Sequence, residues 1–250
     1  LFKANGVKAF QENELNNEEN VKQIVKLRHE RAQILGYKTH AAYVLEERMA
    51  KTPETVLDFL NDLLVKAKPF AEKEIKELSD FAQEIDGIDT LQRWDHAYYA
   101  EKLKQKKFNL SEEELKPYFQ LENVTQGAFD VATKLYGITF KKINTIDKYN
   151  DEVITYEVLD KDGNFLSLLY ADFFPRAGKR PGAWMTSFRE ASNVNGVTKR
   201  PHISIVCNFT KPTKDTPSLL TFQEVTTLFH EFGHALNGML PNTVYESLAG

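Results

Sequence analysis

The sequence predicts a mainly α protein with a small β-sheet confined to its last third. Apolar residues recur at helical spacing through most of the first 137 residues. After Phe140 the pattern changes to β-rich runs separated by turn residues. This change divides the chain into a helical region, 1–140, and a second region, 141–250, that holds a hairpin, a strand and one more helix.

Start and stop signals divide the helical region into successive helices. Thr or Ser caps and a Pro in the first turn mark helix starts, and Gly marks helix ends. Thr52 and Pro53 open the longest helix, and Gly87 closes it. The expected helices cover about 20–35, 39–49, 52–83 and 90–108, then a short helix from 111 and a last one through 129–136.

The second region begins with an expected hairpin in "EVITYEVLDKDGNFLSLLYADFF", where Gly163 tolerates the positive φ of a turn. A loop rich in Gly, Pro and Arg follows. The stretch 202–209, "HISIVCNF", alternates apolar and polar residues as a half-buried strand does. Thr221 with Glu224 forms the pattern of a capping box, and Pro241 ends the helix that follows.

Composition limits the classes of partner. The 250 residues are 42% hydrophobic and 27% charged, and the net charge of −4 is spread over mixed-sign segments. Nucleic acid and membrane partners are therefore not expected. The single cysteine, Cys207, rules out an internal disulfide and fits a reducing, cytoplasmic location, where it is expected to be a packed, inert thiol. No signal for an oligomeric state is present.

The motif "HEFGH" at 230–234 carries the chemistry. At 3.6 residues per turn, His230 and His234 lie one turn apart on one helix face, so both imidazoles can reach a single Zn²⁺ ion. Glu231 is displaced to one side, where its carboxylate suits a metal-bound water. Zinc lowers the pKa of such a water, and Glu231 can take its proton and pass it to a departing amine.

This motif rarely occurs by chance. With 6 His and 36 acidic residues in the chain, the pattern H-E-x-x-H is expected by accident in roughly 2 of 100 such chains. The alternative is a polar, solvated helix face. The helix is otherwise largely apolar, so these three polar side chains would be costly to bury without a metal.

Zinc in a catalytic site usually has three protein ligands and a water. Asn237 and Leu240 stand where a metzincin would have Gly and His, which excludes that class. Glu246 is the nearest downstream carboxylate, but it lies only five residues after Pro241. We therefore favour a third ligand beyond Gly250 and keep Glu246 as the alternative.

The sequence resembles the thimet oligopeptidase family of zinc metallopeptidases, and within it the bacterial peptidyl-dipeptidase (Dcp) branch. The resemblance extends over about residues 21–240. It is carried by "FHEFGHALNGML", "ADFFPRAGKRPGAWMTSF", "HISIVCNFTKP", "WDHAYYAEKLKQKKFNLSEEELKPYFQLENV" and "LRHERAQILGYKTHAAYVLEERMAKTPE".

The resemblance implies a helical, zincin-type peptidase with a small sheet beside the zinc helix, acting on short peptides. It implies that region 1–140 forms one wall of a substrate channel and that region 141–250 is part of the catalytic region, cut before its end. A third zinc ligand, a glutamate on a following helix, would lie outside this chain. Asn237 departs from the histidine usual in the family, so no role beside the metal is carried over to it.

Two further groups of residues are candidates for substrate contact. Gly182, Ala183 and Trp184, or else the strand 202–209, could present a backbone edge to an extended peptide; a plain core strand is the alternative. Four cations could attract a peptide carboxylate, although a solvated loop is the commoner explanation. They are Arg176, Lys179, Arg180 and Arg189.

These features predict a zinc peptidase with one Zn²⁺ ion that releases dipeptides from free carboxyl ends of short peptides. An endo-acting oligopeptidase of the same family is the nearest alternative. The chain starts at Leu1 and stops soon after the zinc helix, which indicates a fragment. Because its zinc site is incomplete, the fragment is expected to be inactive alone, and a noncatalytic peptide-binding helical domain is the alternative from another class.

Overall fold

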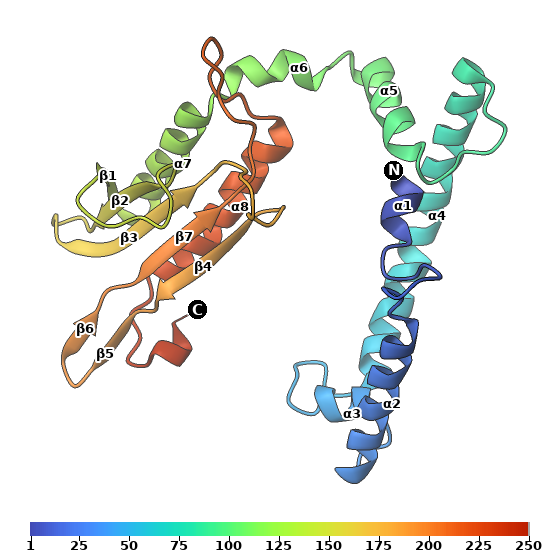
Figure 1. Cartoon of the computed structure of the whole chain (residues 1–250), viewed down its shortest axis with the longest axis horizontal. Coiled ribbons are helices and arrows are strands. Elements are labelled where there is room, and N and C mark those ends of the chain that lie inside the picture. The colour runs from blue at the N-terminus through green and yellow to red at the C-terminus, as the bar shows by residue number, and fades with distance from the viewer. Residues whose placement is uncertain (250) are drawn as a thin grey trace. The chain divides into compact units, whose positions relative to one another are not determined.

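The computed structural model describes residues 1–249, of which helix makes up 48% and strand 15%. This confirms a mainly α chain with a small sheet. The residues form two compact units, Leu1–Asn109 and the chain from Leu110 onward (Figure 1). The division differs from the boundary at 140 that the change of composition predicts.

The first unit is entirely helical. Thr52 caps the long helix with its side chain, and Gly87 ends it in the left-handed conformation at φ 66°, as the sequence predicts. The expected helix from Thr90 instead begins at His96, because Asp95 closes a turn by accepting a hydrogen bond from the Gln92 backbone. The helices are α1 (Phe2–Gly6), α2 (Glu18–Ile34), α3 (His40–Leu45), α4 (Pro53–Asp86) and α5 (His96–Phe108).

The core of the first unit is small. Leu78 and Ala82 of α4 pack against Tyr99 of α5, whose hydroxyl donates to Asp86 at 3.1 Å. Many apolar side chains of α2 and α4 are exposed within the described residues, among them Phe59 and Phe70. The unit therefore carries much apolar helix surface that its own core does not cover.

The second unit holds a five-stranded sheet in the order β1-β2-β3-β7-β4 and a separate hairpin, β5–β6. Strand β7 pairs parallel with β3 and antiparallel with β4, which places β4 at one edge of the sheet (Figure 1). The strands are β1 (Thr139–Ile143), β2 (Ile154–Leu159), β3 (Phe165–Asp172), β4 (Trp184–Arg189), β5 (Ser192–Val194), β6 (Val197–Lys199) and β7 (His202–Val206). The other elements are α6 (Glu112–Leu115), η1 (Lys116–Tyr118), α7 (Leu121–Tyr136), α8 (Phe222–Met239) and η2 (Glu246–Leu248).

The predicted hairpin is confirmed as β2–β3, with Gly163 at φ 81° in its turn. The predicted strand at 202–209 is confirmed as β7, although it ends at Val206. Strands β1 and β4 and the β5–β6 hairpin were not predicted. The β5–β6 hairpin has only three residues in each strand, joined by Asn195 and Gly196 at positive φ. Its sequence is typical of a polar connecting segment.

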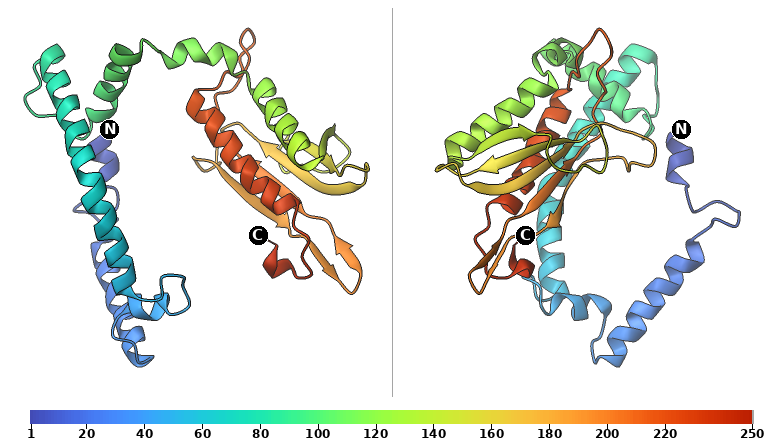
Figure 2. Two further views of the ribbon diagram at one scale, coloured as in Figure 1. Left: turned by 180° about the vertical axis from the view of Figure 1, so that it is seen from behind. Right: turned by 60° about the vertical axis from the view of Figure 1, so that its left-hand side comes forward.

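Helices α7 and α8 lie on the same face of the five-stranded sheet, as the left view of Figure 2 shows. Phe129 of α7 stacks on Phe140 of β1 with ring centroids 4.0 Å apart, and Phe232 of α8 lies 5.7 Å from both rings. This shared aromatic core places α7 in the second unit, which explains why the division falls before it. Among the described residues, no helix combines the length and the apolar character needed to cross a bilayer.

Candidate active site

Helix α8 carries the motif, and its start is fixed as the sequence predicts. The Thr221 hydroxyl accepts from the Glu224 backbone at 3.1 Å, and the Glu224 carboxylate accepts from the Thr221 backbone at 2.8 Å. This reciprocal capping box satisfies two backbone donors that a helix start leaves free. The helix therefore begins at a defined residue, just after Thr221. Where it begins determines the direction in which each motif side chain points.

The two histidines converge. Their Nε2 atoms lie 3.2 Å apart, and their rings are nearly perpendicular at 86° with centroids 4.8 Å apart. Two nitrogens each about 2.0–2.1 Å from one tetrahedral ion would lie about 3.3–3.4 Å apart. The observed spacing of His230 and His234 therefore fits a pair of imidazoles that share one metal ion, and both side chains are exposed to solvent.

Glu231 differs from the histidines on either side of it. The residue is only 8% exposed, but its carboxylate oxygens still reach solvent, and they have no hydrogen bond or ion pair to any other described residue. Cys207 lies just after β7. Burial raises the pKa of this thiol to about 12, and the nearby Glu231 carboxylate adds to the rise. A carboxylate that reaches solvent and has no protein donor can take a proton from a water molecule, whereas a paired carboxylate serves the structure.

The histidines lie on the flank of α8 that faces away from α7. Successive helix residues turn by about 100°, so each histidine is about 200° from Phe232, which packs toward α7 and β1. The sheet runs from β1 at one edge to β4 at the other, and α8 packs on β7 and β4. The histidine flank therefore faces the β4 side of the sheet.

A glycine brings α8 close to these strands. A Cβ at Gly238 would lie 2.8 Å from Cδ1 of Ile203 and 3.7 Å from Cε of Met185. Ile203 belongs to β7 and Met185 to β4. The absence of a side chain at Gly238 thus permits the motif helix to pack closely on β7.

The alternative third ligand, Glu246, is not part of this site. Its carboxylate forms an ion pair with Lys199 at 2.7 Å, and the hydrogen bond from Lys199 lowers the pKa of Glu246. Within residues 1–249 no group of three His, Cys, Asp or Glu side chains could hold a metal ion. The favoured position beyond Gly250 lies outside the described residues.

The three proposed substrate-contact residues lead into the edge strand. Trp184 is the first residue of β4, and the Gly182 carbonyl accepts from the Asn208 side chain at 2.7 Å. The alternative stretch, 202–209, does not present a free strand edge, because β7 is hydrogen-bonded to β3 on one side and to β4 on the other. Of the two candidates, only the segment that enters β4 adjoins an unpaired strand edge within the described sheet.

Two of the four cations, Arg176 and Lys179, have a different role from either one expected, whereas Arg180 is exposed as the solvated-loop alternative expects. Both Arg176 and Lys179 form ion pairs with Asp172 at 2.8 Å. They are therefore neither solvated cations nor unpaired cations available to a peptide carboxylate. The Arg189 guanidinium donates to the Arg200 carbonyl at 2.7 Å. Sequence reasoning missed Asp172; the available signal was an acidic residue at the end of an apolar strand, followed at short range by two cations.

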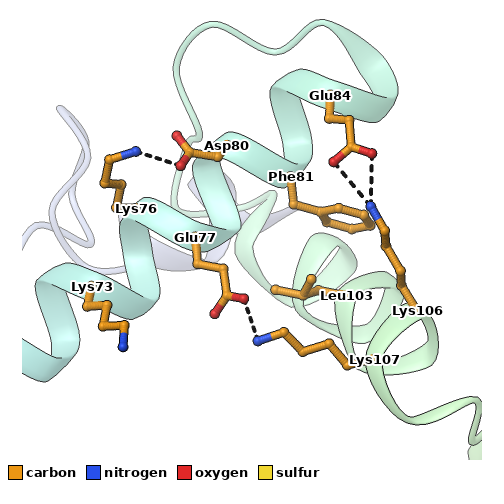
Figure 3. A pocket seen from close by; sticks show the side chains of 9 residues that line it. All are labelled: Lys73, Lys76, Glu77, Asp80, Phe81, Glu84, Leu103, Lys106 and Lys107. Atoms are coloured by element: carbon orange, nitrogen blue, oxygen red, sulfur yellow. Dashed lines mark hydrogen bonds and ion pairs between the residues drawn. The ribbon is translucent and has the colours of Figure 1, made fainter.

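The first unit has a groove of its own between α4 and α5, with a volume of about 860 Å³ (Figure 3). Lys106 binds Glu84 at 2.9 Å and lies over the Phe81 ring, and Lys107 binds Glu77 at 2.5 Å. These exposed pairs across two helices each contribute about 0–1 kcal/mol. No histidine or cysteine lines the groove, so it has none of the side chains that the motif brings together.

Two converging imidazoles one helical turn apart, with a carboxylate on the residue after the first of them, are the side chains that metal-dependent hydrolases use. The chain belongs to peptidase family M3, whose model matches residues 1–250.

Its relatives include oligopeptidase A of Escherichia coli, 40% identical over 94% of this chain and 35% of the relative. Dipeptidyl carboxypeptidase of Escherichia coli is 39% identical over 92% of this chain and 34% of the relative. A probable cytosolic oligopeptidase A of Arabidopsis thaliana is 38% identical over 91% of this chain and 33% of the relative. The resemblance seen in the sequence is confirmed, and the chain spans about a third of the length of these relatives.

Proposed function

We propose that this chain is the part of a zinc-dependent peptidase that carries two metal ligands and the catalytic base. The observation that carries the proposal is the pair of Nε2 atoms 3.2 Å apart on α8, beside the unpaired Glu231 carboxylate. His230 and His234 would hold one Zn²⁺ ion, with a third protein ligand from beyond Gly250. When bound, zinc supplies an acidified water and polarises a carbonyl oxygen.

Glu231 would act as base and then as acid. Its carboxylate takes a proton from the attacking water, and it then delivers that proton to the nitrogen of the departing amine. No bond forms between enzyme and substrate, because water is the nucleophile. No described residue donates to the Glu231 carboxylate, which supports this role because no protein donor competes with the water for it.

The edge of β4 would hold the substrate. An extended peptide can add to a free strand edge through backbone hydrogen bonds, independent of side-chain identity. Gly182, Ala183 and Trp184 lead into that edge, on the side of the sheet that the histidine flank faces. Short peptides are therefore the proposed substrates, and we propose a cytoplasmic location in line with the single, reduced cysteine.

Release of C-terminal dipeptides is the finer proposal, and endo-acting hydrolysis is its rival. Both have support, because relatives named dipeptidyl carboxypeptidase and oligopeptidase A match this chain to nearly the same degree. The 250 residues alone are proposed to be inactive, because the described part lacks a complete set of three ligands.

The test is to measure zinc content and peptide hydrolysis in the protein extended past Gly250. We expect one zinc per chain and hydrolysis, both lost in His234→Ala. His29→Ala is the matched control, because His29 is exposed on α2 and its loss should change neither quantity. Retention of stoichiometric zinc and activity in His234→Ala would contradict the proposal.

A further inference from the structure

A second buried carboxylate, Asp172, lies at the end of β3, on the opposite face of the sheet from α8. Leu169, Ala171 and Phe173 point into the core that α7 and α8 cover, so the side chain of Asp172 points the other way by strand alternation. The residue is 2% exposed. A charge buried to this extent is tolerated only when it is paired and hydrogen-bonded.

The carboxylate of Asp172 is fully partnered. Arg176 donates to both oxygens, at 2.8 and 2.9 Å, and Lys179 donates to Oδ1 at 2.8 Å. The hydroxyl of Tyr149 donates to Oδ2 at 3.0 Å. Burial alone would raise the pKa of Asp172, but these three donors outweigh it and hold the pKa below its usual value. Asp172 therefore stays ionised.

Lys179 is buried with it. Its side chain is 3% exposed, and its ammonium also donates to the carbonyl oxygens of Asp172 and Phe174, at 3.1 and 2.8 Å. All three donors of the ammonium group are thus used. Loss of the Asp172 charge would leave a buried cation without its counter-ion, which is a large perturbation.

These contacts fix the loop that joins β3 to β4. Arg176 and Lys179 belong to this loop, 173–183, and tie its middle to the end of β3. Asn208, just after β7, ties its last part by donating to the carbonyl oxygens of Arg180 and Gly182, at 2.9 and 2.7 Å. Strand β4 starts at Trp184, two residues beyond the last of these contacts.

We infer that Asp172 is a positioning residue for peptide binding. Through Arg176 and Lys179 it fixes the loop that sets the place and register of the β4 edge beside the histidine flank. This inference rests on the proposed function, since it assigns the β4 edge to the peptide. Asp172 lies on the far face of the sheet from α8 and acts through the loop, so it is not a catalytic residue.

The test compares Asp172→Asn with Ser167→Ala in the protein extended past Gly250. Ser167 is a matched control: it lies buried in the same strand, and its hydroxyl donates to the Pro201 carbonyl at 2.9 Å and to the Leu168 carbonyl at 3.2 Å, neither of which belongs to the loop. Asparagine keeps the shape of Asp172 and removes its charge. Because a misplaced edge weakens substrate binding at every stage, KM should rise roughly tenfold in Asp172→Asn with kcat and zinc content nearly unchanged.

Limited trypsin digestion supplies a second readout that needs no activity. In the native protein Arg176 and Lys179 are held by Asp172, so cleavage after them should be slow. Asp172→Asn should be cut faster within 176–180, and Ser167→Ala should not. If Asp172→Asn does not fold, Arg176→Gln replaces it, because the Arg176 side chain is 24% exposed and its loss is milder; a smaller rise in KM is then expected.

Three results would overturn the inference: an unchanged KM, a loss of kcat or zinc in place of a rise in KM, or equal effects of Ser167→Ala. Faster trypsin cleavage with unchanged KM would show that the ion pairs hold the loop without serving the substrate. Failure of the proposed function is distinguishable, because the unsubstituted protein would then lack zinc or hydrolysis while the trypsin comparison would still report on the loop.

Discussion

Two buried carboxylates in the second unit, Asp172 and Glu231, differ in their partners and therefore in what they can do. Asp172 accepts hydrogen bonds from Arg176, Lys179 and Tyr149, so its charge has a structural role. Glu231 has no such partner among the described residues, and it follows His230, one of the two exposed imidazoles of the motif, in the sequence. A carboxylate without a protein partner remains available to exchange a proton with a substrate or a water molecule.

The ion pairs of Asp172 predict a pH dependence of stability. Its folded-state pKa is lowered, so its contribution to stability is present above the unfolded-state pKa of about 3.9 and is lost as pH falls through the folded-state value. Asp172→Asn should lower Tm at pH 7, and the difference should shrink as pH falls below about 4. Thermal unfolding of both proteins from pH 7 to pH 3 measures this. A constant difference in Tm over that range would argue against the ion pairs.

Cys207 should be chemically inert in the folded protein. It is fully buried, and its thiol pKa is raised to about 12, so almost no thiolate exists at pH 8. Iodoacetamide at pH 8 should label Cys207 only after addition of denaturant, as mass spectrometry can show. Because the folded state keeps its proton above pH 9 while the unfolded state loses it, this thiol should also lower stability as pH rises past about 9. Rapid labelling of the native protein would contradict this account.

At the scale of elements, the contact between α8 and the sheet determines where the motif lies. The helix packs closely on β7 and β4 at Gly238, four residues after His234. Two glycines of the same helix differ in their surroundings. A Cβ at Gly238 would meet the buried side chain of Ile203, whereas a Cβ at Gly233 would meet nothing within 4 Å.

Alanine at these two positions should have opposite effects. Gly238→Ala should destabilise the protein by about 1–3 kcal/mol, because Ile203 is fully buried and cannot move aside without strain. Gly233→Ala should stabilise it by about 0.5–1 kcal/mol through helix propensity. Denaturant unfolding of both variants provides the comparison. Equal effects of the two substitutions would show that α8 is not held closely against β7.

The elements with strong local signals were predictable from the sequence, and those fixed by long-range pairing were not. Thr221 and Glu224 identify the start of α8, and Gly163 identifies the β2–β3 turn, because caps and turns depend on a few adjacent residues. The sequence of strand β4 shows no clear alternation of apolar and polar residues. The strand is defined by its antiparallel hydrogen bonding to β7. The boundary at 140 followed composition, whereas Phe129 of α7 belongs to the core of the second unit.

The candidate site follows the same rule. His230, Glu231 and His234 share one helix, so their spacing alone determines that the imidazoles converge. The burial of Glu231 and the pairing of Asp172 with Lys179 depend on contacts between separate elements. For that reason the sequence indicates solvent or substrate as the partner of Arg176 and Lys179, and only the fold shows that both bind Asp172.

At the scale of the whole molecule, the chain covers about a third of the length of its relatives, and the first unit leaves much apolar helix surface exposed. We predict that the 250-residue chain alone binds the dye ANS more strongly than the protein extended to the length of those relatives, because contiguous exposed apolar surface binds such dyes. Fluorescence titration of the two proteins at equal concentration measures this. Equal binding would show that the added residues do not cover α2 and α4.

The substrate's carboxyl end distinguishes the two proposed activities. A dipeptide-releasing enzyme must recognise a free carboxylate, so amidation of a peptide should lower kcat/KM by about tenfold or more. An endo-acting enzyme should cleave both forms at similar rates. Mass analysis of products from one peptide, free and amidated, decides between them in the extended protein, and similar rates with internal cleavage would contradict the dipeptidase proposal.

The most direct test of the central claim is Glu231→Gln in the protein extended past Gly250, with zinc content and kcat measured on the same sample. The account predicts that zinc stays at one per chain, because His230 and His234 are intact, while kcat falls by about 10²–10⁴-fold through loss of the base. A variant that keeps its zinc and also its kcat would contradict the assignment of proton transfer to Glu231.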